Sequence, residues 1–300
     1  MKIRLGQKIL GVLFILPILA IVLNYNSYGF MLDPVFDRDI QIDKISVSGY
    51  TVRTALSYDY IDNSFKKRNF ITDLIYFNEN GYPSEKIFYN DNGEILKSEK
   101  YFYDESSNLI SIIVLIPGDP SNYDLNFKYE KDENGRITKR YAYNSEGILI
   151  SYYVYSYSGD NLISEEKFSS DNISISRIYY NYDSNKKLTK TTEYRMSAGN
   201  PFIYLVHNYN SKGLIERTIQ YTNDGKVFSS CEQKYDAYNN LIESICRNAQ
   251  GKLHWKYTLN YNDKNLISEK VVYSDETTPY EKIVYNYENE EESNKILGIR

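Results

Sequence analysis

The sequence contains few of the residues from which catalytic and metal sites are usually built. Its 300 residues include two cysteines and two histidines, His207 and His254. Two histidines without a companion cluster of Cys, Asp or Glu do not form a zinc signature. The GxSxG, P-loop, GxGxxG and HExxH motifs are absent. The sequence therefore predicts no catalytic residue, no metal site and no cofactor.

No stretch of the chain concentrates lysine and arginine. The chain has 40 acidic and 35 basic side chains and a net charge of −5. Nucleic-acid-binding domains carry a basic patch or stripe, which this sequence does not have. Carboxylates are frequent, and most of Glu165, Glu166, Glu216, Glu243 and Glu269 follow a Leu-Ile pair at one repeated position, which is typical of a solvated face rather than of an active site. We therefore expect no nucleic-acid partner and no enzymatic activity.

The chain also lacks an apolar run of the usual transmembrane length. Its longest run covers residues 9–23, which is 15 residues, and three cations lie within the first eight positions. Ser27 and Gly29 are small residues suited to a cleavage site before Phe30. This pattern predicts a signal peptide over residues 1–29, with an uncleaved signal anchor as the alternative. We expect an exported protein of the periplasm, cell surface or medium, touching the membrane only through such an anchor.

Tyrosine is abundant, with 33 residues in a chain that is 15% aromatic. Disordered chains are poor in aromatic residues, so this composition favours a folded protein. Tyrosine also favours the half-buried, pleated surface of a β-sheet. The composition therefore indicates β-structure.

An aromatic residue precedes a cluster of Asn, Asp and Gly at intervals of about 26 residues. A second series, aromatic except at Leu115 and Cys246, falls between the members of the first and is also followed by turns, so each unit contains two turns and two strands. The first series consists of Phe77, Tyr103, Tyr129, Tyr157, Tyr182, Tyr209, Tyr235, Tyr261 and Tyr287.

The segments between these turns alternate apolar and polar residues, as in residues 255–261 and 125–129. A period of two is typical of strands with one buried face, and Asn and Gly tolerate the left-handed backbone of hairpin turns. The sequence predicts an all-β protein in which tandem 26-residue antiparallel hairpins form one long curved or coiled sheet. Helix should be nearly absent outside the leader, and closure of the sheet is left open.

Four regions follow from this pattern. Residues 1–29 are the leader, and residues 71–287 contain the tandem repeats. Residues 30–70 keep strand-like runs without the motif, which favours a degenerate capping repeat over a separate domain. Residues 288–300 are acidic and aperiodic, so we expect a flexible tail.

The recurring motif Tyr-x-Tyr-Asp/Asn, followed by Gly or Asn and then Leu-Ile, resembles the YD repeat of Rhs-type and wall-associated bacterial proteins and of teneurins. Good matches are Tyr101 to Asp104 with Asn108, and Tyr261 with Asn265. The resemblance implies a spiralling β-sheet on an exported protein. The longer period, the missing Asp-Pro-x-Gly core segment and the short chain argue against toxin packaging. A weaker similarity is to MORN-like, YwqK-type hairpin repeats.

Cys231 and Cys246 lie on either side of a predicted hairpin turn. Pairing about that turn places the two thiols opposite each other, where an oxidising compartment would allow a disulfide. A shift of one residue in the register would instead point them to opposite faces. Both alternatives remain open from the sequence.

Paired tyrosines recur on single strand faces and should form rows across the sheet. Such rows could offer a platform for sugar rings or for a partner protein. They could equally form a thin, partly wet core. The candidate binding surface consists of Tyr101, Tyr103, Tyr155, Tyr157, Tyr180, Tyr182, Tyr285 and Tyr287.

Together these features predict a non-enzymatic repeat protein that mediates binding or adhesion, with a carbohydrate or protein ligand. An immunity or antitoxin-like binder of a partner toxin is the first alternative. A glycan-processing enzyme is a distant alternative, because no pair of carboxylates is singled out for that chemistry.

Overall fold

The computed structural model describes residue 45 and residues 48–119, 123–197 and 199–289. The predicted leader at residues 1–29 lies outside the described residues, as do residues 290–300 of the predicted tail. Within the described ranges the chain is all-β with essentially no helix, which confirms the predicted fold class.

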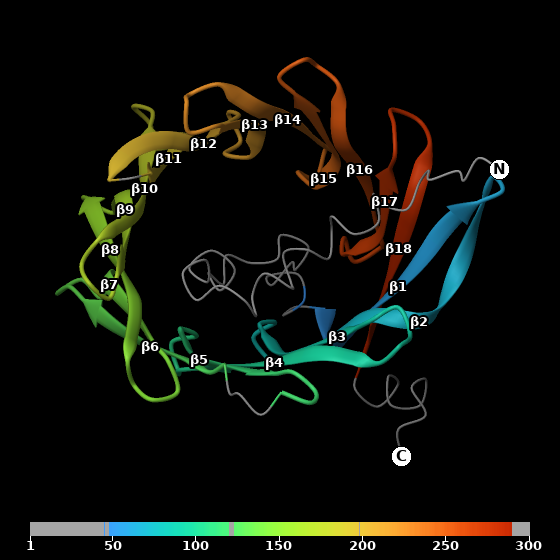
Figure 1. The fold of residues 1–300 in the computed structure, drawn as a ribbon, viewed down its shortest axis with the longest axis horizontal. Coiled ribbons are helices and arrows are strands. Elements are labelled where there is room, and N and C mark those ends of the chain that lie inside the picture. Colours follow the sequence, from blue (N-terminus) through green and yellow to red (C-terminus); the bar gives the residue numbers. More distant parts are fainter. Residues whose placement is uncertain (1–44, 46–47, 120–122, 198, 290–300) are drawn as a thin grey trace, which may run out of the picture. The chain divides into compact units, whose positions relative to one another are not determined.

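Eighteen strands follow one another in antiparallel succession, so that nine hairpins make up the sheet (Figure 1). Their bounds are β1 Val52–Ile61, β2 Ser64–Phe77, β3 Pro83–Tyr89, β4 Ile95–Tyr103, β5 Leu109–Leu115, β6 Leu125–Lys131, β7 Ile137–Tyr143, β8 Leu149–Ser158, β9 Asn161–Ser169, β10 Ser174–Tyr182, β11 Leu188–Ser197, β12 Asn200–Tyr209, β13 Ile215–Tyr221, β14 Val227–Tyr235, β15 Leu241–Asn248, β16 Leu253–Tyr261, β17 Ile267–Tyr273 and β18 Pro279–Glu288.

Most of the hairpin turns share one geometry, which explains the Asx and Gly positions of the repeat. In the turn between β14 and β15, the Asp236 N–H donates to the Asn240 carbonyl at 2.9 Å, and Asn239 has φ 66°. The Asp236 carboxylate also accepts the N–H groups of Tyr238 and Asn240, both at 2.8 Å. A tight turn followed by a left-handed residue gives the bulged hairpin that Asn and Gly favour.

The sheet closes on itself, since β1 pairs with both β2 and β18. Paired positions run from Val52 opposite Glu288 to Asp59 opposite Glu281. The sequence predicted one long curved or coiled sheet, and the structure corrects this expectation to a closed 18-stranded barrel. Twist and curvature accumulate over successive hairpins, and β1, which lacks the motif, supplies the strand that pairs with the last one.

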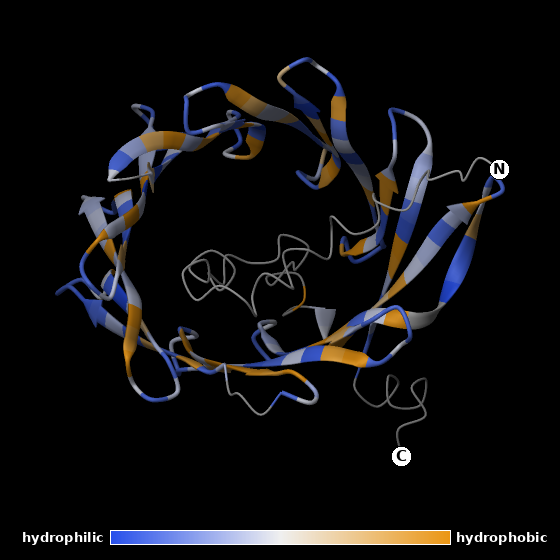
Figure 2. Cartoon of the chain, viewed as in Figure 1, coloured by the Kyte–Doolittle hydropathy of each residue, from blue (hydrophilic) through white to orange (hydrophobic). Residues whose placement is uncertain are grey.

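The two faces of the closed sheet differ in burial. Residues directly opposite one another share a face, so one face can be followed through the register from Ala55 to Tyr285 and on to Cys246 and Cys231. We call this more buried side the inner face, because side chains converge on the concave side of a closed sheet. Hydropathy alternates along many strands in Figure 2, as a sheet with two unlike faces requires.

One core cluster lies on the inner face beside the closing seam. It joins Ala55, Leu259, Ile267 and Tyr285, all at most 7% exposed. Partly buried side chains of Tyr257, Tyr261 and Tyr287 pack against it, among others. Tyrosine thus replaces aliphatic residues in part of this core.

Candidate functional site

The eight tyrosines that the sequence offered as a binding surface lie on the inner face. The register places Tyr101 opposite Ile112, Tyr180 opposite Thr191, and Tyr285 opposite Ala55. Residues two positions apart on a strand share a face, so their partners Tyr103, Tyr182 and Tyr287 lie there too. The same holds for Tyr155, which is opposite Glu165, and for Tyr157.

Six tyrosines of the repeat, among them Tyr103, Tyr157 and Tyr182, tie the end of one strand to the beginning of the strand before it. Each hydroxyl donates to the main-chain carbonyl oxygen of the residue twenty positions earlier, at or next to the start of that preceding strand. The six bonds run from Tyr103 to Pro83 (2.8 Å), Tyr129 to Leu109 (2.6 Å), Tyr157 to Ile137 (2.8 Å), Tyr182 to Leu162 (2.8 Å), Tyr235 to Ile215 (2.7 Å) and Tyr261 to Leu241 (2.7 Å). This contact gives the tyrosine of the repeat a structural task.

Burial changes the acid–base behaviour of two tyrosines on this face. Burial is the main cause that raises the pKa of Tyr103, and the nearby Tyr82 adds to it. Burial also raises the pKa of Tyr180, with Glu165 as the next contributor. Both phenols therefore stay protonated beyond the pH at which an exposed tyrosine ionises.

Cations lie over aromatic rings of the inner face. The Arg140 guanidinium and the Lys167 ammonium lie 4.4 Å and 5.3 Å from the centre of the Tyr153 ring. Lys167 is only 4% exposed. Burial raises the pKa of the Glu193 carboxyl, while Arg195 at 2.9 Å opposes that shift. The inner face therefore combines aromatic rings with buried charges of both signs.

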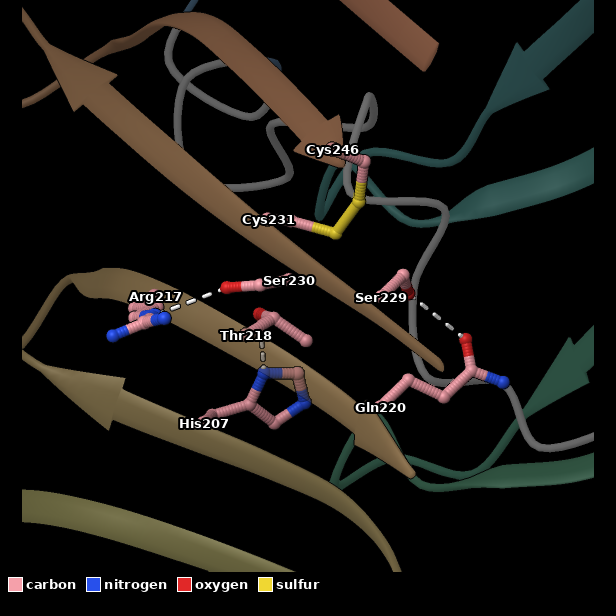
Figure 3. Close-up of a disulfide and its surroundings, with 8 residues drawn as sticks. All are labelled: His207, Arg217, Thr218, Gln220, Ser229, Ser230, Cys231 and Cys246. Carbon is pink, nitrogen blue, oxygen red and sulfur yellow. Dashed lines mark hydrogen bonds between the residues drawn. A yellow bond between two sulfur atoms is a disulfide. The ribbon is translucent and has the colours of Figure 1, made fainter. Parts of the chain in front are cut away.

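The two cysteines are direct partners across the hairpin of β14 and β15, and their sulfur atoms form a disulfide (Figure 3). Cys231 is 7% exposed and Cys246 is 1% exposed, both on the inner face. Next to them, His207 Nδ1 lies 2.8 Å from Thr218 Oγ1. His254 lies in an edge-to-face contact with Phe228, so the two histidines occupy separate environments.

The glutamates that follow the Leu-Ile pairs divide between the two faces. Glu243 forms ion pairs with Lys234 at 2.6 Å and Lys256 at 3.7 Å, and Glu269 pairs with Lys282 at 3.5 Å. Glu165 lies instead on the inner face opposite Tyr155, because it is one residue further along its strand than Glu243 is on β15. Among the described residues, no group of three or more His, Cys, Asp or Glu side chains could hold a metal ion.

An aromatic row that the sequence did not single out crosses the outer face. Tyr141 on β7, Tyr152 on β8 and Phe168 on β9 are direct cross-strand partners. Their ring centres are 5.8 Å and 5.0 Å apart, and the second pair is stacked at 10°. Tyr143 extends this outer aromatic row, at 6.3 Å from Tyr141. All four side chains are partly exposed.

Polar side chains fix the hydroxyls of the outer aromatic row and border it. The Tyr141 hydroxyl donates to Glu130 at 2.6 Å, and the Tyr152 hydroxyl donates to Asn172 at 2.9 Å. The bond to Glu130 is the main cause that raises the pKa of Tyr141. Lys128 lies 5.2 Å from the centre of the Tyr143 ring. The row thus lies beside charged and amide groups.

The signal for the outer aromatic row was present in the sequence. Residues 151–157 carry aromatic or apolar residues on both faces of one strand. If one face of such a strand packs on the core, the apolar side chains of its other face must either contact a second layer or remain exposed. The pairing of Tyr152 with Tyr141 and with Phe168 depends on the register across the two successive turns that join β7 to β8 and β8 to β9, which spacing alone does not fix.

Comparison with known proteins does not assign a family. No family model matches the chain, and no curated protein matches it. Among solved structures, the complex TcdB2-TccC3 matches at 11% identity over 69% of this chain and 13% of the other, with a TM-score of 0.34. A mutant Tc holotoxin pore from Photorhabdus luminescens matches at 14% identity over 69% and 12% of the two chains, with a TM-score of 0.29.

A porin-like protein from Bacteroides uniformis matches at 9% identity over 80% of this chain and 98% of the other, with a TM-score of 0.33. The chain spans about an eighth of the length of the toxin chains and nearly the full length of the porin-like one. No helix in the described part of the chain is both long and apolar enough to cross a membrane.

Proposed function

We propose that this protein is an exported, non-enzymatic binding protein of the cell envelope that holds a carbohydrate ligand on the outer aromatic row. The observation that carries the proposal is the row itself: Tyr141, Tyr152 and Phe168 lie side by side on three successive strands and remain partly exposed. Aromatic rings supply apolar contact for sugar rings, and hydroxyls at their edges supply hydrogen bonds.

The border of the row supports a hydroxyl-rich ligand. Glu130, which forms an ion pair with Lys139 at 3.3 Å, and Asn172 offer donors and acceptors at the rim of the rings. The surrounding strands present charges of both signs, such as Glu166 paired with Arg177. A surface of mixed charge does not select a strongly charged polymer, whereas neutral or weakly charged sugars suit it. The predicted leader supports export.

A glycan array tests this proposal with single substitutions. We expect the wild-type chain to bind a defined set of glycans and Tyr152→Ala to lose about tenfold or more in affinity for them, since aromatic contacts dominate such sites. Tyr280→Ala is the matched control, because Tyr280 is 50% exposed on β18, away from the row. No glycan binding, or equal loss in both variants, would refute the proposal; capture of a toxin partner would favour the immunity alternative.

A further inference from the structure

The hairpin turns at one end of the closed sheet form a rim whose charges are segregated by sign. Successive strands are antiparallel, so every second turn lies at the same end of the sheet. Six neighbouring turns of this rim join β4 to β5, β6 to β7, β8 to β9, β10 to β11, β12 to β13 and β14 to β15. In the order of strands around the sheet, they lie away from the closing seam of β1 and β18.

The first three of these turns carry negative charge at exposed positions. Glu105, Glu133 and Asp160 are exposed there, and none of them has an ion-pair partner in the described part of the chain. The one cation within these three turns, Arg136, is already paired with Asp132 at 2.6 Å. We call Glu105, Glu133 and Asp160 the acidic arc of the rim.

The next three turns carry exposed lysines instead. Lys186, Lys187 and Lys212 form no ion pair with any described residue, and we call them the basic arc. The acids of these turns, Asp183 and Asp236, use their carboxylates to accept N–H groups of their own turns. The two arcs therefore adjoin each other, with the change of sign between the β8–β9 turn and the β10–β11 turn.

Hydrogen bonds between neighbouring turns hold part of the basic arc in place. Lys187 Nζ donates to the Ser211 carbonyl at 3.1 Å, and Lys212 Nζ donates to Asn239 Oδ1 at 2.9 Å. Both acceptors are neutral, so these bonds orient the ammonium groups without neutralising them. Side chains that are already ordered lose less conformational entropy when a partner binds.

We propose that this rim is a dimerisation surface, on which a second copy of the chain docks rim to rim about a two-fold axis. A two-fold interface brings the same surface patch of both copies together, so the patch must be complementary to itself. An axis that passes between the β8–β9 and β10–β11 turns places the acidic arc of one copy opposite the basic arc of the other. Asp160 then faces Lys186 and Lys187, and Glu133 faces Lys212.

The presence of both signs on one rim favours a second copy over other partners. The acidic arc would repel a polyanion, and the basic arc would repel a polycation. The same axis places the turn of Glu105 opposite the turn of Tyr238, which is 78% exposed. Tyrosine is enriched in protein interfaces, so this ring can add apolar contact to the charge pairs. The inference does not depend on the proposed carbohydrate ligand.

The oligomeric state of the full-length protein in mild detergent tests the inference by light scattering after size exclusion. We expect a concentration-dependent dimer at about 0.01 M salt and a much weaker one at about 1 M, because the Debye length falls from about 30 Å to about 3 Å. Lys212→Glu should weaken the dimer about tenfold or more, since it places two carboxylates opposite each other. Lys252→Glu is the matched control, because it makes the same change of charge at an exposed lysine in the β15–β16 turn of the other rim.

Mixing two variants provides a second measurement. Glu133→Lys and Lys212→Glu should each dimerise poorly alone, whereas their equal mixture should form a heterodimer of about wild-type affinity, because opposite charges face each other again at both positions. A wild-type protein that stays monomeric in low salt, or a dimer that salt does not weaken, would overturn the proposal. So would equal effects of Lys212→Glu and Lys252→Glu, or a mixture that dimerises no better than its components.

Discussion

At the scale of single residues, the recurring tyrosine joins the end of one strand to the beginning of the strand before it. Its ring lies on the inner face, and its hydroxyl reaches a main-chain carbonyl at the beginning of the neighbouring, paired strand. The bond lies in a partly buried position, where a polar group that loses its hydrogen-bond partner costs free energy. The contact therefore stabilises the sheet as well as the position of the tyrosine. Phenylalanine could fill the same space but could not donate this bond.

Tyr103→Phe tests this task. It removes the bond from Tyr103 to the Pro83 carbonyl and should lower the free energy of unfolding by about 1–2 kcal/mol. Tyr238→Phe is the control, since Tyr238 is 78% exposed and should show almost no change. Urea unfolding monitored by far-ultraviolet circular dichroism measures both, and equal stability of the two variants would contradict the assigned role.

The raised pKa values of Tyr103 and Tyr180 predict a loss of stability in alkali. Below the ordinary tyrosine pKa of about 10, both phenols are protonated in the folded and the unfolded chain, so they cause no loss. Above it, the unfolded chain releases protons that the folded chain retains, and the free energy of unfolding falls as pH rises. Urea unfolding at about pH 8 and about pH 10.5 should show this decrease. A higher stability at the more alkaline pH would contradict it.

The disulfide adds a covalent constraint at the same scale. Cys231 and Cys246 are 15 residues apart in sequence, and closing a loop of that size stabilises a fold by about 3 kcal/mol in the chain-entropy model. The double variant Cys231→Ser/Cys246→Ser should unfold at a correspondingly lower urea concentration than the wild type. Adding reductant should lower the wild-type midpoint toward that of the variant and leave the variant unchanged. Reductant-insensitive wild-type unfolding would argue against the bond.

At the scale of elements, the hairpin turn is the unit that the sequence repeats. The left-handed position is glycine in some turns and another residue in others, such as Gly213 with φ 80° and Lys186 with φ 61°. The two turns have the same main-chain hydrogen bonds. The free-energy cost of a side chain at the left-handed position can therefore be measured twice, by removing the side chain from one turn and by adding one to the other.

Lys186→Gly should raise the free energy of unfolding by about 0.5–1 kcal/mol, since a non-glycine residue is strained in the left-handed region. Gly213→Ala should lower it by about 1 kcal/mol for the same reason, because nothing lies within 4 Å of an added Cβ atom and no clash contributes. Thermal or urea unfolding of the two variants measures this. Changes of the same sign would show that the turns are not equivalent.

The sequence predicted the strands and turns well because both depend on local chemistry. Alternation around Trp255 to Tyr261 and the Asx-Gly clusters specify hairpins without reference to distant residues. The pairing of Cys231 with Cys246 across a single turn was one of two alternatives that the sequence left open, and the structure selects it. The outer aromatic row could not be derived in this way, because Tyr141, Tyr152 and Phe168 meet only through the register between strands. Sequence spacing likewise left open which face of the sheet the predicted tyrosines occupy.

At the scale of the whole molecule, closure distinguishes this sheet from an open repeat array. Nine hairpins supply the strands, and the pairing of β1 with β18 removes the two free edges that an open sheet would present. The closing hairpin lacks the repeat motif, yet it contributes Ala55 to the core beside Tyr285 and places Arg53 4.7 Å from the centre of the Tyr285 ring.

Cross-linking across the seam tests closure most directly. Tyr58 and Lys282 are direct partners on β1 and β18, so Tyr58→Cys/Lys282→Cys should form a disulfide under mild oxidation. Peptide mapping by mass spectrometry should identify the linked pair, while the native cysteines remain joined to each other. The control Tyr58→Cys/Lys100→Cys, with the second cysteine on β4, should not cross-link within one chain. A seam pair that fails to link in folded protein would show that the first and last strands do not meet, and would contradict the closed sheet.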